Sequence, residues 1–377
     1  MIIQSKNVWI DESFKSAQIE IKEKKIIRIY PFGTNKPDFD FGESYVMPGL
    51  IDIHTHGYKG INANYINEEQ VREWVEYLPH EGVTSVLITT STAPEKDLVS
   101  SLSAIVKFKD TQKKGANVLG IHMEGPFLEM AHRGAQSAES IMKPTPEKMK
   151  LFMDAAQNQI KLVAIAPETD TDYATTKFCI KNGIVVSVGH SGATMAMVKE
   201  VKALGVNNIT HTYNAMSPLN HREPGVVGAA MRYEDMYAEI IGDGVHVHND
   251  AINILGRLKG KDKLILVTDS VSIKGMAPGI YKAQDRVVTI DSLGFGHLAD
   301  GRLAGSSNRM NKLLKNCTGP CELPFATAIN AATCNPAKLL GIANVKGYLR
   351  TDYDADIVVT NQDFEVIQTF VLGKAQL

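Results

Sequence analysis

Six residues of this chain have side chains of the kinds that bind metal ions, and each lies near the end of an apolar run. They are His54, His56, Glu124, His190, His211 and Asp269. Imidazole and carboxylate groups suit zinc, iron and related divalent ions. Any one of these residues alone is explained as well by a core hydrogen bond or a helix cap. Because buried strands consist mainly of Val, Ile and Leu, ionisable residues at several strand ends indicate a shared metal site.

The segments that carry these residues have the pattern of buried strands followed by amphipathic helices. Eight strands are predicted, ending at His56, Thr90, Glu124, Glu168, His190, His211, Gly244 and Asp269. Helices are predicted between them, for example over 68–78, 146–157, 193–204 and 250–258. This alternation predicts a parallel α/β fold, and eight such units over about 280 residues match a (β/α)₈ TIM barrel. A doubly wound open sheet has the same periodicity and remains the alternative.

Closure into a barrel would bring the six candidate residues together. The carboxyl ends of the strands then meet at one mouth, where barrel enzymes carry their active sites. His54 and His56 are two residues apart, so on a strand their side chains share one face. His122 precedes Glu124 by the same spacing, but a structural role is the better interpretation for it.

The two ends of the chain differ from its middle. Short runs that alternate apolar and polar residues fill the first 46 residues, and DADIVVT and EVIQTFVLG repeat this texture near the C-terminus. We therefore expect a small β-sandwich domain formed by 1–46 and 340–377, around a catalytic barrel of 47–339. The Gly-rich stretch 275–300 interrupts the strand–helix rhythm and predicts a hairpin inserted after the eighth strand.

The composition excludes several classes of function. The chain has 377 residues, of which 44% are hydrophobic and 22% charged, and a net charge of −2. No basic field is present to attract nucleic acid or anionic lipid, and no apolar run reaches the ~20 residues of a membrane span. The N-terminus lacks the apolar stretch of a signal peptide, and the four cysteines form no Cys-x-x-Cys pair. These features predict a cytoplasmic, soluble protein with reduced thiols.

A possible anion site follows the sixth predicted strand. Asn214 and Ala215 come shortly after His211, and the segment HREPG contains Arg222. A loop of this kind can direct backbone N–H groups and a guanidinium at an anion. Alone, Arg222 would be interpreted as a surface residue. Beside a metal site, recognition of a phosphate or carboxylate is the better interpretation.

A family resemblance appears in nine motifs, in the same order along the chain. These are MPGLIDIHTHG, HMEGPF, VGHSGAT, HTYNAM, HREPGVVG, DGVHV, LVTDS, GRLAGSS and DADIVV. The chain resembles the N-acetylglucosamine-6-phosphate deacetylases of the amidohydrolase superfamily, from about residue 46 to the C-terminus. The PGxIDxHxHG pattern marks only the superfamily, whereas HMEGPF together with NAM, REPG and DGVHV is more specific to these deacetylases.

The resemblance implies roles for the candidate residues. Glu124, His190 and His211 would bind the main divalent metal, and His54 and His56 a second one that only some members have. One or two ions per subunit are expected, zinc or iron first, with manganese or cobalt also possible. Asp269 would be the catalytic acid/base. The implied substrate contacts are Ala135, Gln136, Asn214, Ala215, Arg222, His246, Leu303, Ala304 and Gly305. In relatives the equivalent of Arg222 enters the neighbouring subunit's site, which implies a homodimer.

The implied reaction is hydrolysis of an amino-sugar phosphate, N-acetylglucosamine 6-phosphate, by a metal-activated hydroxide. One departure concerns Gln136, where some relatives have a His that polarises the acetyl carbonyl; Gln is a neutral donor. Either Gln136 donates a weaker hydrogen bond, or a second metal at His54 and His56 activates the carbonyl.

Other branches of the superfamily and a scaffold without activity are the alternatives. The superfamily also contains deaminases, cyclic-amide hydrolases and amino-acid deacylases. No Lys ends a predicted strand where it could become a carboxylated bridging ligand, which argues against the cyclic-amide branch. A scaffold protein would be expected to have lost some of the ligands, whereas all are present.

Overall fold

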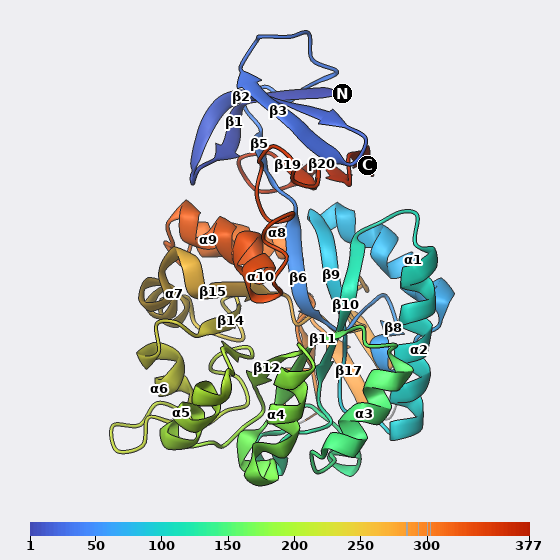
Figure 1. The fold of residues 1–377 in the computed structure, drawn as a ribbon, viewed down its shortest axis with the longest axis vertical. Helices are drawn as coiled ribbons and strands as arrows, with labels where there is room; N and C mark the ends of the chain where they lie inside the picture. The colour runs from blue at the N-terminus through green and yellow to red at the C-terminus, as the bar shows by residue number, and fades with distance from the viewer. Residues whose placement is uncertain (284–285, 293, 300, 302) are drawn as a thin grey trace.

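The centre of the molecule is a parallel β-barrel (Figure 1). The computed structural model describes residues 1–283, 286–292, 294–299, 301 and 303–377. The barrel strands, in order around the sheet, are β6 (Leu50–Thr55), β9 (Val83–Thr90), β10 (Asn117–Glu124), β11 (Ile160–Ile165), β12 (Val185–Val188), β13 (Asn208–Ile209), β14 (Tyr237–Ile241) and β15 (Leu264–Val267). Chain order and spatial order agree, as they do in a TIM barrel.

The first and last barrel strands lie against each other. The Asp269 backbone N–H donates to the His54 carbonyl over 2.9 Å, and Thr55 and Ser270 form a parallel bridge. At the same seam the Thr268 hydroxyl donates to the Asp52 carboxylate over 2.6 Å. These contacts close the sheet, so the predicted (β/α)₈ barrel is confirmed and the open doubly wound sheet is excluded.

A helix follows each barrel strand, and two more precede the C-terminal strands. The helices are α1 (Glu68–Tyr77), α2 (Glu95–Thr111), α3 (Pro146–Ala155), α4 (Ala174–Lys181), α5 (Met195–Leu204), α6 (Gly225–Arg232), α7 (Asn249–Lys263), α8 (Met310–Thr318), α9 (Phe325–Ala332) and α10 (Cys334–Leu339). The four helices predicted as examples are present, although α7 continues five residues beyond its predicted end. Among the described residues, we find no helix with the length and apolar character needed to cross a membrane.

Helix α1 shows how local sequence produces these elements. Asn67 accepts a hydrogen bond from the Gln70 N–H, and the Gln70 side chain accepts one from the Asn67 N–H. This capping box satisfies donors that the helix itself leaves free. Val71, Trp74 and Val75 recur at helical spacing and are fully buried against the barrel.

The two ends of the chain form a separate sheet at one end of the barrel (Figure 1). Its strands are β1 (Ile2–Ile10), β2 (Ser13–Lys22), β3 (Lys25–Pro31), β4 (Phe39–Asp40), β5 (Tyr45–Pro48), β19 (Ile357–Thr360), β20 (Val366–Val371) and β21 (Lys374–Ala375). Strand β5 joins the ends because it pairs parallel with β1 and antiparallel with β19, Val46 opposite Val359. Ile19, Ile357 and Phe370 belong to its own buried core.

The terminal sheet covers one end of the barrel and leaves the other end open (Figure 1). Strand β5 runs into β6 through the single residue Gly49, so the amino end of β6 adjoins the terminal sheet. The carboxyl end of β6, which carries His54, therefore points away from that sheet.

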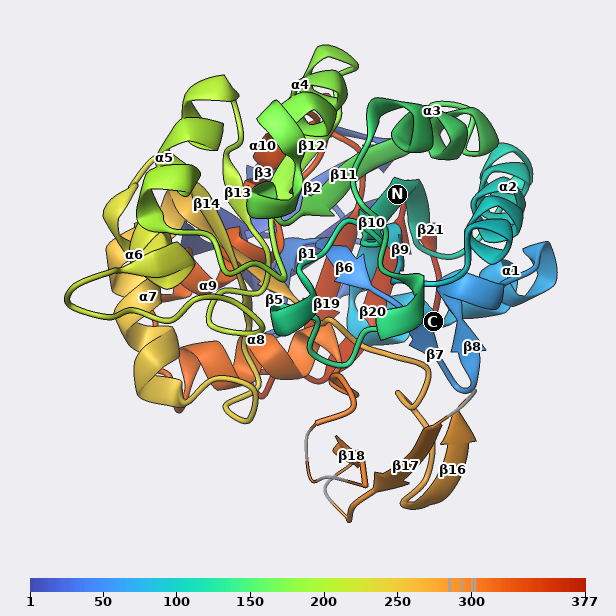
Figure 2. The same cartoon turned by 90° about the horizontal axis from the view of Figure 1, so that it is seen from below.

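An inserted β-structure lies beside this open end (Figure 2). It consists of β16 (Gly279–Ala283), β17 (Arg286–Ile290) and β18 (Gly296–His297), paired antiparallel. The predicted hairpin over 275–300 is thus present after the eighth strand, although residues 284, 285, 293 and 300 lie outside the described part. A short ladder of β7 (Gly57–Tyr58) and β8 (Ile61–Asn62) follows β6.

Candidate metal centre

The six candidate ligands form one buried cluster at the open end of the barrel. One group of four comprises His54, His56, Glu124 and Asp269, and a second group comprises Glu124, His190 and His211. Within each group the potential ligand atoms lie within 4.8 Å of one another. All six are brought together, as the strand pattern predicted, and Glu124 belongs to both groups.

Four of the six do not lie on strands, contrary to the prediction: His56 directly follows β6, which ends at Thr55, and the other three lie further beyond their strand ends. Strands β12, β13 and β15 end at Val188, Ile209 and Val267, two residues before His190, His211 and Asp269. These three residues have left-handed backbone, with φ of 48°, 26° and 46°. Such φ values are uncommon for residues with a Cβ and concentrate at functional sites. The turn at each position directs the side chain across the barrel mouth, which regular strand alternation would not do.

The Glu124 carboxylate lies between the imidazoles. Its Oε1 is 2.9 Å from His190 Nε2, 2.8 Å from His211 Nε2 and 3.3 Å from His54 Nε2. Its Oε2 is 3.2 Å from His56 Nε2. Burial opposes its negative charge, but the surrounding histidines outweigh that effect and hold its pKa well below the ordinary value. Glu124 is therefore an anion whose Oε1 lies near histidines of both groups and whose Oε2 lies near His56.

The hydrogen bonds behind the imidazoles show which nitrogens face the centre. His54 Nδ1 donates to the Glu239 carboxylate over 3.0 Å, and His56 Nδ1 donates to the Thr89 carbonyl over 3.0 Å. His190 Nδ1 donates likewise to the His132 carbonyl over 2.9 Å. Because these partners accept only, the ring hydrogen lies on Nδ1 and the Nε2 lone pair is directed inward.

The inward nitrogens lie closer together than neutral lone pairs favour. His54 Nε2 is 3.2 Å from His56 Nε2, and His190 Nε2 is 3.1 Å from His211 Nε2. A cation placed among them removes that repulsion, and a hydrogen-bonded Nδ1 is the usual arrangement of a metal-binding histidine. The residues present therefore fit a divalent metal.

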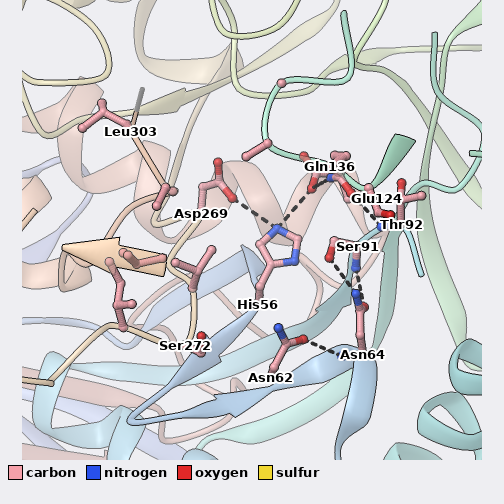
Figure 3. A pocket seen from close by; sticks show the side chains of 18 of the residues that line it. His56, Asn62, Asn64, Ser91, Thr92, Glu124, Gln136, Asp269, Ser272 and Leu303 are labelled. Atoms are coloured by element: carbon pink, nitrogen blue, oxygen red, sulfur yellow. Dashed lines mark hydrogen bonds and ion pairs between the residues drawn. The ribbon is translucent and has the colours of Figure 1, made fainter. Parts of the chain in front are cut away.

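Asp269 is the more exposed of the two carboxylates of the cluster that border a pocket (Figure 3). Its Oδ1 is 3.2 Å from His56 Nε2 and 3.5 Å from His54 Nε2, while 17% of its side chain is exposed. Burial raises its pKa, but in the absence of a metal His54 and His56 outweigh that effect when they are protonated, and they lower the pKa of Asp269. Asp269 is an ionised carboxylate that a molecule in the pocket can reach.

The pocket is a cavity of about 750 Å³ above the cluster. Eight of the predicted substrate contacts line it, namely Ala135, Gln136, Asn214, Ala215, His246, Leu303, Ala304 and Gly305. Arg222 does not line it and is exposed in the loop before α6. None of the lining side chains that the structure describes belongs to Lys or Arg. Within one chain, the described part of this pocket therefore supplies no permanent cation.

Gln136 is held between the backbone and a candidate ligand (Figure 3). The Thr92 N–H donates to Gln136 Oε1 over 2.6 Å, which fixes the orientation of the amide. Gln136 Nε2 consequently faces Glu124 Oε2, at 2.6 Å. One N–H of Gln136 is used in this contact, and the residue also borders the pocket.

Several residues of the centre were not predicted from the sequence. Glu239 is fully buried on β14 and holds His54, and Asp243 Oδ2 accepts from His246 Nδ1 over 2.7 Å. A carboxylate inside the apolar run YAEII was the one available signal for Glu239. The other unpredicted lining residues include Asn62, Asn64, Ser91, Thr92, Ile273, Met276, Tyr281, Val288 and Leu298. Their positions depend on how the strands and the inserted β-structure meet.

Comparison with known families is consistent with this geometry. The sequence pattern of the amidohydrolase family matches residues 45–375, nearly the whole chain.

The chain belongs to the amidohydrolase family.

Among amidohydrolases, the N-acetylglucosamine-6-phosphate deacetylase of Bacillus subtilis is 34% identical to this chain, covering 96% of it and 93% of the relative. The N-acetylgalactosamine-6-phosphate deacetylase of Escherichia coli O157:H7 is 29% identical, covering 97% and 95%. A crystal structure of N-acetyl-D-glucosamine-6-phosphate deacetylase from Mycobacterium smegmatis superposes with a TM-score of 0.94 at 27% identity, covering all of both chains. The superposition extends the likeness to the terminal sheet as well as the barrel.

Proposed function

We propose that this chain hydrolyses the acetamide of N-acetylglucosamine 6-phosphate to give glucosamine 6-phosphate and acetate. The observation that carries the proposal is the placement of Asp269, an ionised carboxylate at the floor of the pocket beside a buried set of metal ligands. An amide resists attack by water, so its hydrolysis needs an activated nucleophile and a protonated leaving amine. The relatives that carry this reaction in their names cover nearly the whole chain.

Two adjacent metal positions are part of the proposal. Glu124, His190 and His211 would hold one ion, and His54, His56 and Asp269 would hold a second that shares Glu124. Zinc or iron is the proposed metal, because imidazole and carboxylate suit both. A divalent ion held there lowers the pKa of water and polarises a carbonyl.

The protein's own groups would move the proton. Asp269 accepts a proton from the attacking water and returns it to the departing nitrogen, which its exposure to the pocket allows. Gln136 has a second N–H beyond the one bonded to Glu124, and this N–H can donate to the acetyl oxygen as negative charge develops on it.

Substrate phosphate needs positive charge that the described lining side chains lack. We propose that Arg222 supplies it to the pocket of a neighbouring copy in a homodimer, because Arg222 is exposed on its own chain and absent from its own pocket lining. Asn214, Ala215 and His246 would complete the sugar-phosphate site. Binding the phosphate fixes the acetamide over the metal centre and lowers the entropic part of the barrier.

Acetate release tests the proposal directly. The purified full-length chain, loaded separately with Zn²⁺ and Fe²⁺, is assayed on N-acetylglucosamine 6-phosphate and on the unphosphorylated sugar. We expect turnover of the phosphorylated sugar that chelation abolishes and metal restores. Turnover of both sugars at equal rates would contradict the phosphate assignment, and no turnover with any metal would contradict the function.

The galactosamine epimer is the second substrate to test. A relative that is named for N-acetylgalactosamine 6-phosphate aligns over 97% of this chain, so overall similarity does not decide between the two sugars. The ratio of kcat/KM for the two phosphorylated sugars, measured with the same preparation, assigns the preferred epimer.

A further inference from the structure

We propose that Glu239 is a positioning residue that maintains the second metal position by holding His54. The proposal rests on the two adjacent metal positions proposed above. Glu239 lies in the middle of β14 and does not border the pocket, so it cannot touch substrate. Its effect must therefore pass through the ligands that it contacts.

The contacts of Glu239 fix both the orientation and the tautomer of His54. Glu239 Oε2 accepts from His54 Nδ1 over 3.0 Å, and Oε1 accepts from Asn208 Nδ2 over 2.7 Å. Because a carboxylate oxygen faces His54 Nδ1 as acceptor, the ring hydrogen lies on Nδ1 and the Nε2 lone pair stays available. A carboxylate behind a metal-binding histidine commonly has this role.

The same carboxylate also contacts the other metal group. Glu239 Oε2 accepts a long hydrogen bond of 3.4 Å from the His211 backbone N–H, and the Glu239 carbonyl accepts one of 2.8 Å from Thr212. His211 has left-handed backbone at this point, with φ of 26°. Glu239 thus supports a ligand side chain in one group and a ligand turn in the other.

Charge gives a second reason to connect Glu239 with a cation. Glu239 is fully buried, and a buried carboxylate without a positive partner is strongly destabilising. Among the described residues, His54 is the one titratable side chain in recorded contact with it. A divalent ion bound by His54 would place positive charge on the far side of that imidazole and would offset the buried anion.

Zinc binding tests the proposal without relying on turnover. Metal-depleted wild type and Glu239→Gln are titrated with buffered Zn²⁺, and bound zinc per chain is measured after desalting. We expect wild type to bind two ions, and Glu239→Gln to bind one normally and the other with an affinity lowered by about 10- to 100-fold. A wild type that binds only one ion, or a variant that binds both as wild type does, would overturn the proposal.

Glu81→Gln is the matched control. Glu81 is also a fully buried carboxylate, but its recorded partners are Lys274 and the Met310 backbone, and it touches none of the six ligands. Glu81→Gln should bind both zinc ions normally. If it also lost an ion, the loss in Glu239→Gln would reflect general damage from removing a buried carboxylate and not the contact with His54. Zinc should raise the unfolding temperature less in Glu239→Gln than in wild type. If Glu239 had a purely structural role, the variant would unfold at a lower temperature without metal, but zinc would raise its unfolding temperature as much as in wild type.

A second variant keeps the test decisive if Glu239→Gln does not fold. Asn208→Ser removes the amide that holds Glu239 Oε1 but leaves the carboxylate and His54 in place. We expect the zinc ion at the second metal position to bind several-fold less tightly than in wild type. Unchanged binding of this ion would contradict the role of Glu239. If the zinc result holds but the chain releases no acetate from N-acetylglucosamine 6-phosphate, the proposed function fails while this inference stands.

Discussion

Asp269 combines two features that the other carboxylate of the cluster lacks. Its side chain is more exposed, 17% against 4% for Glu124, and only one of its oxygens lies near imidazole nitrogens. Asn at this position keeps the size and one oxygen but cannot accept a proton. We therefore expect Asp269→Asn to lower turnover by about 10²- to 10⁴-fold, the usual contribution of general acid–base catalysis. Acetate release and metal content are measured together, and activity near the wild-type level would remove Asp269 from the mechanism.

Gln136 permits a comparison between loss of a donor and introduction of charge. Gln136→Ala removes the N–H that we propose for the acetyl oxygen, and a lost donor of this kind costs up to about 10²- to 10³-fold in kcat. Gln136→Glu would place a second carboxylate 2.6 Å from Glu124 Oε2 and should change metal binding as well. If Gln136→Ala leaves kcat intact, a second metal rather than Gln136 activates the carbonyl.

At the scale of elements, the barrel strands were predictable and their functional ends were not. Strands such as SVLITT are buried on both faces and appear in the sequence as continuous apolar runs. Where β12, β13 and β15 end depends on left-handed residues at His190, His211 and Asp269, which local propensity does not favour. Glu239 could not be paired with His54 from sequence, because 185 residues separate them and only barrel closure joins them.

The loop after β15 is anchored by a buried ion pair. Lys274 Nζ lies 2.9 and 3.0 Å from the two oxygens of Glu81, and both side chains are fully buried. Glu81 also accepts from the backbone N–H of Met310, the first residue of α8. The pair thus connects the segment before β9, the start of α8 and the loop that carries Ser272 and Ile273 into the pocket.

Breaking this pair should destabilise the protein more than removing it entirely. Lys274→Met leaves Glu81 buried without a cation, so we expect the free energy of unfolding to fall by about 3–5 kcal/mol. Adding Glu81→Gln removes the uncompensated charge and should recover much of that loss. Lys150→Met, which breaks an exposed pair with Asp154, is the control and should cost no more than about 0.5 kcal/mol. Urea unfolding of the four proteins makes the comparison, and equal losses for both Lys274 variants would contradict it.

At the scale of the whole molecule, the proposed phosphate site combines the pocket of one copy with Arg222 of another. The terminal sheet closes one end of the barrel, and the open end carries the ligand cluster and the inserted β-structure. Arg222 is exposed beyond its own pocket, so the proposed phosphate site is complete only if two copies exchange this residue. A dimer of two differently impaired variants could then regain activity, which would not happen if each subunit contained its own complete site.

Mixed dimers of two impaired variants distinguish these arrangements. Arg222→Ala retains Asp269, and Asp269→Asn retains Arg222. If Arg222 acts on the neighbouring pocket, a dimer with one chain of each kind has one complete site. Isolated mixed dimers should then have about half of the wild-type sites, because each has one of two sites intact, and the unseparated mixture about a quarter, because half of its dimers are mixed. The two variants are co-expressed with different tags, and acetate release by the doubly tagged dimers is compared with each variant alone. If Arg222 acted within its own chain, neither site of the mixed dimer would be complete, and activity would not exceed the mean of the two variants.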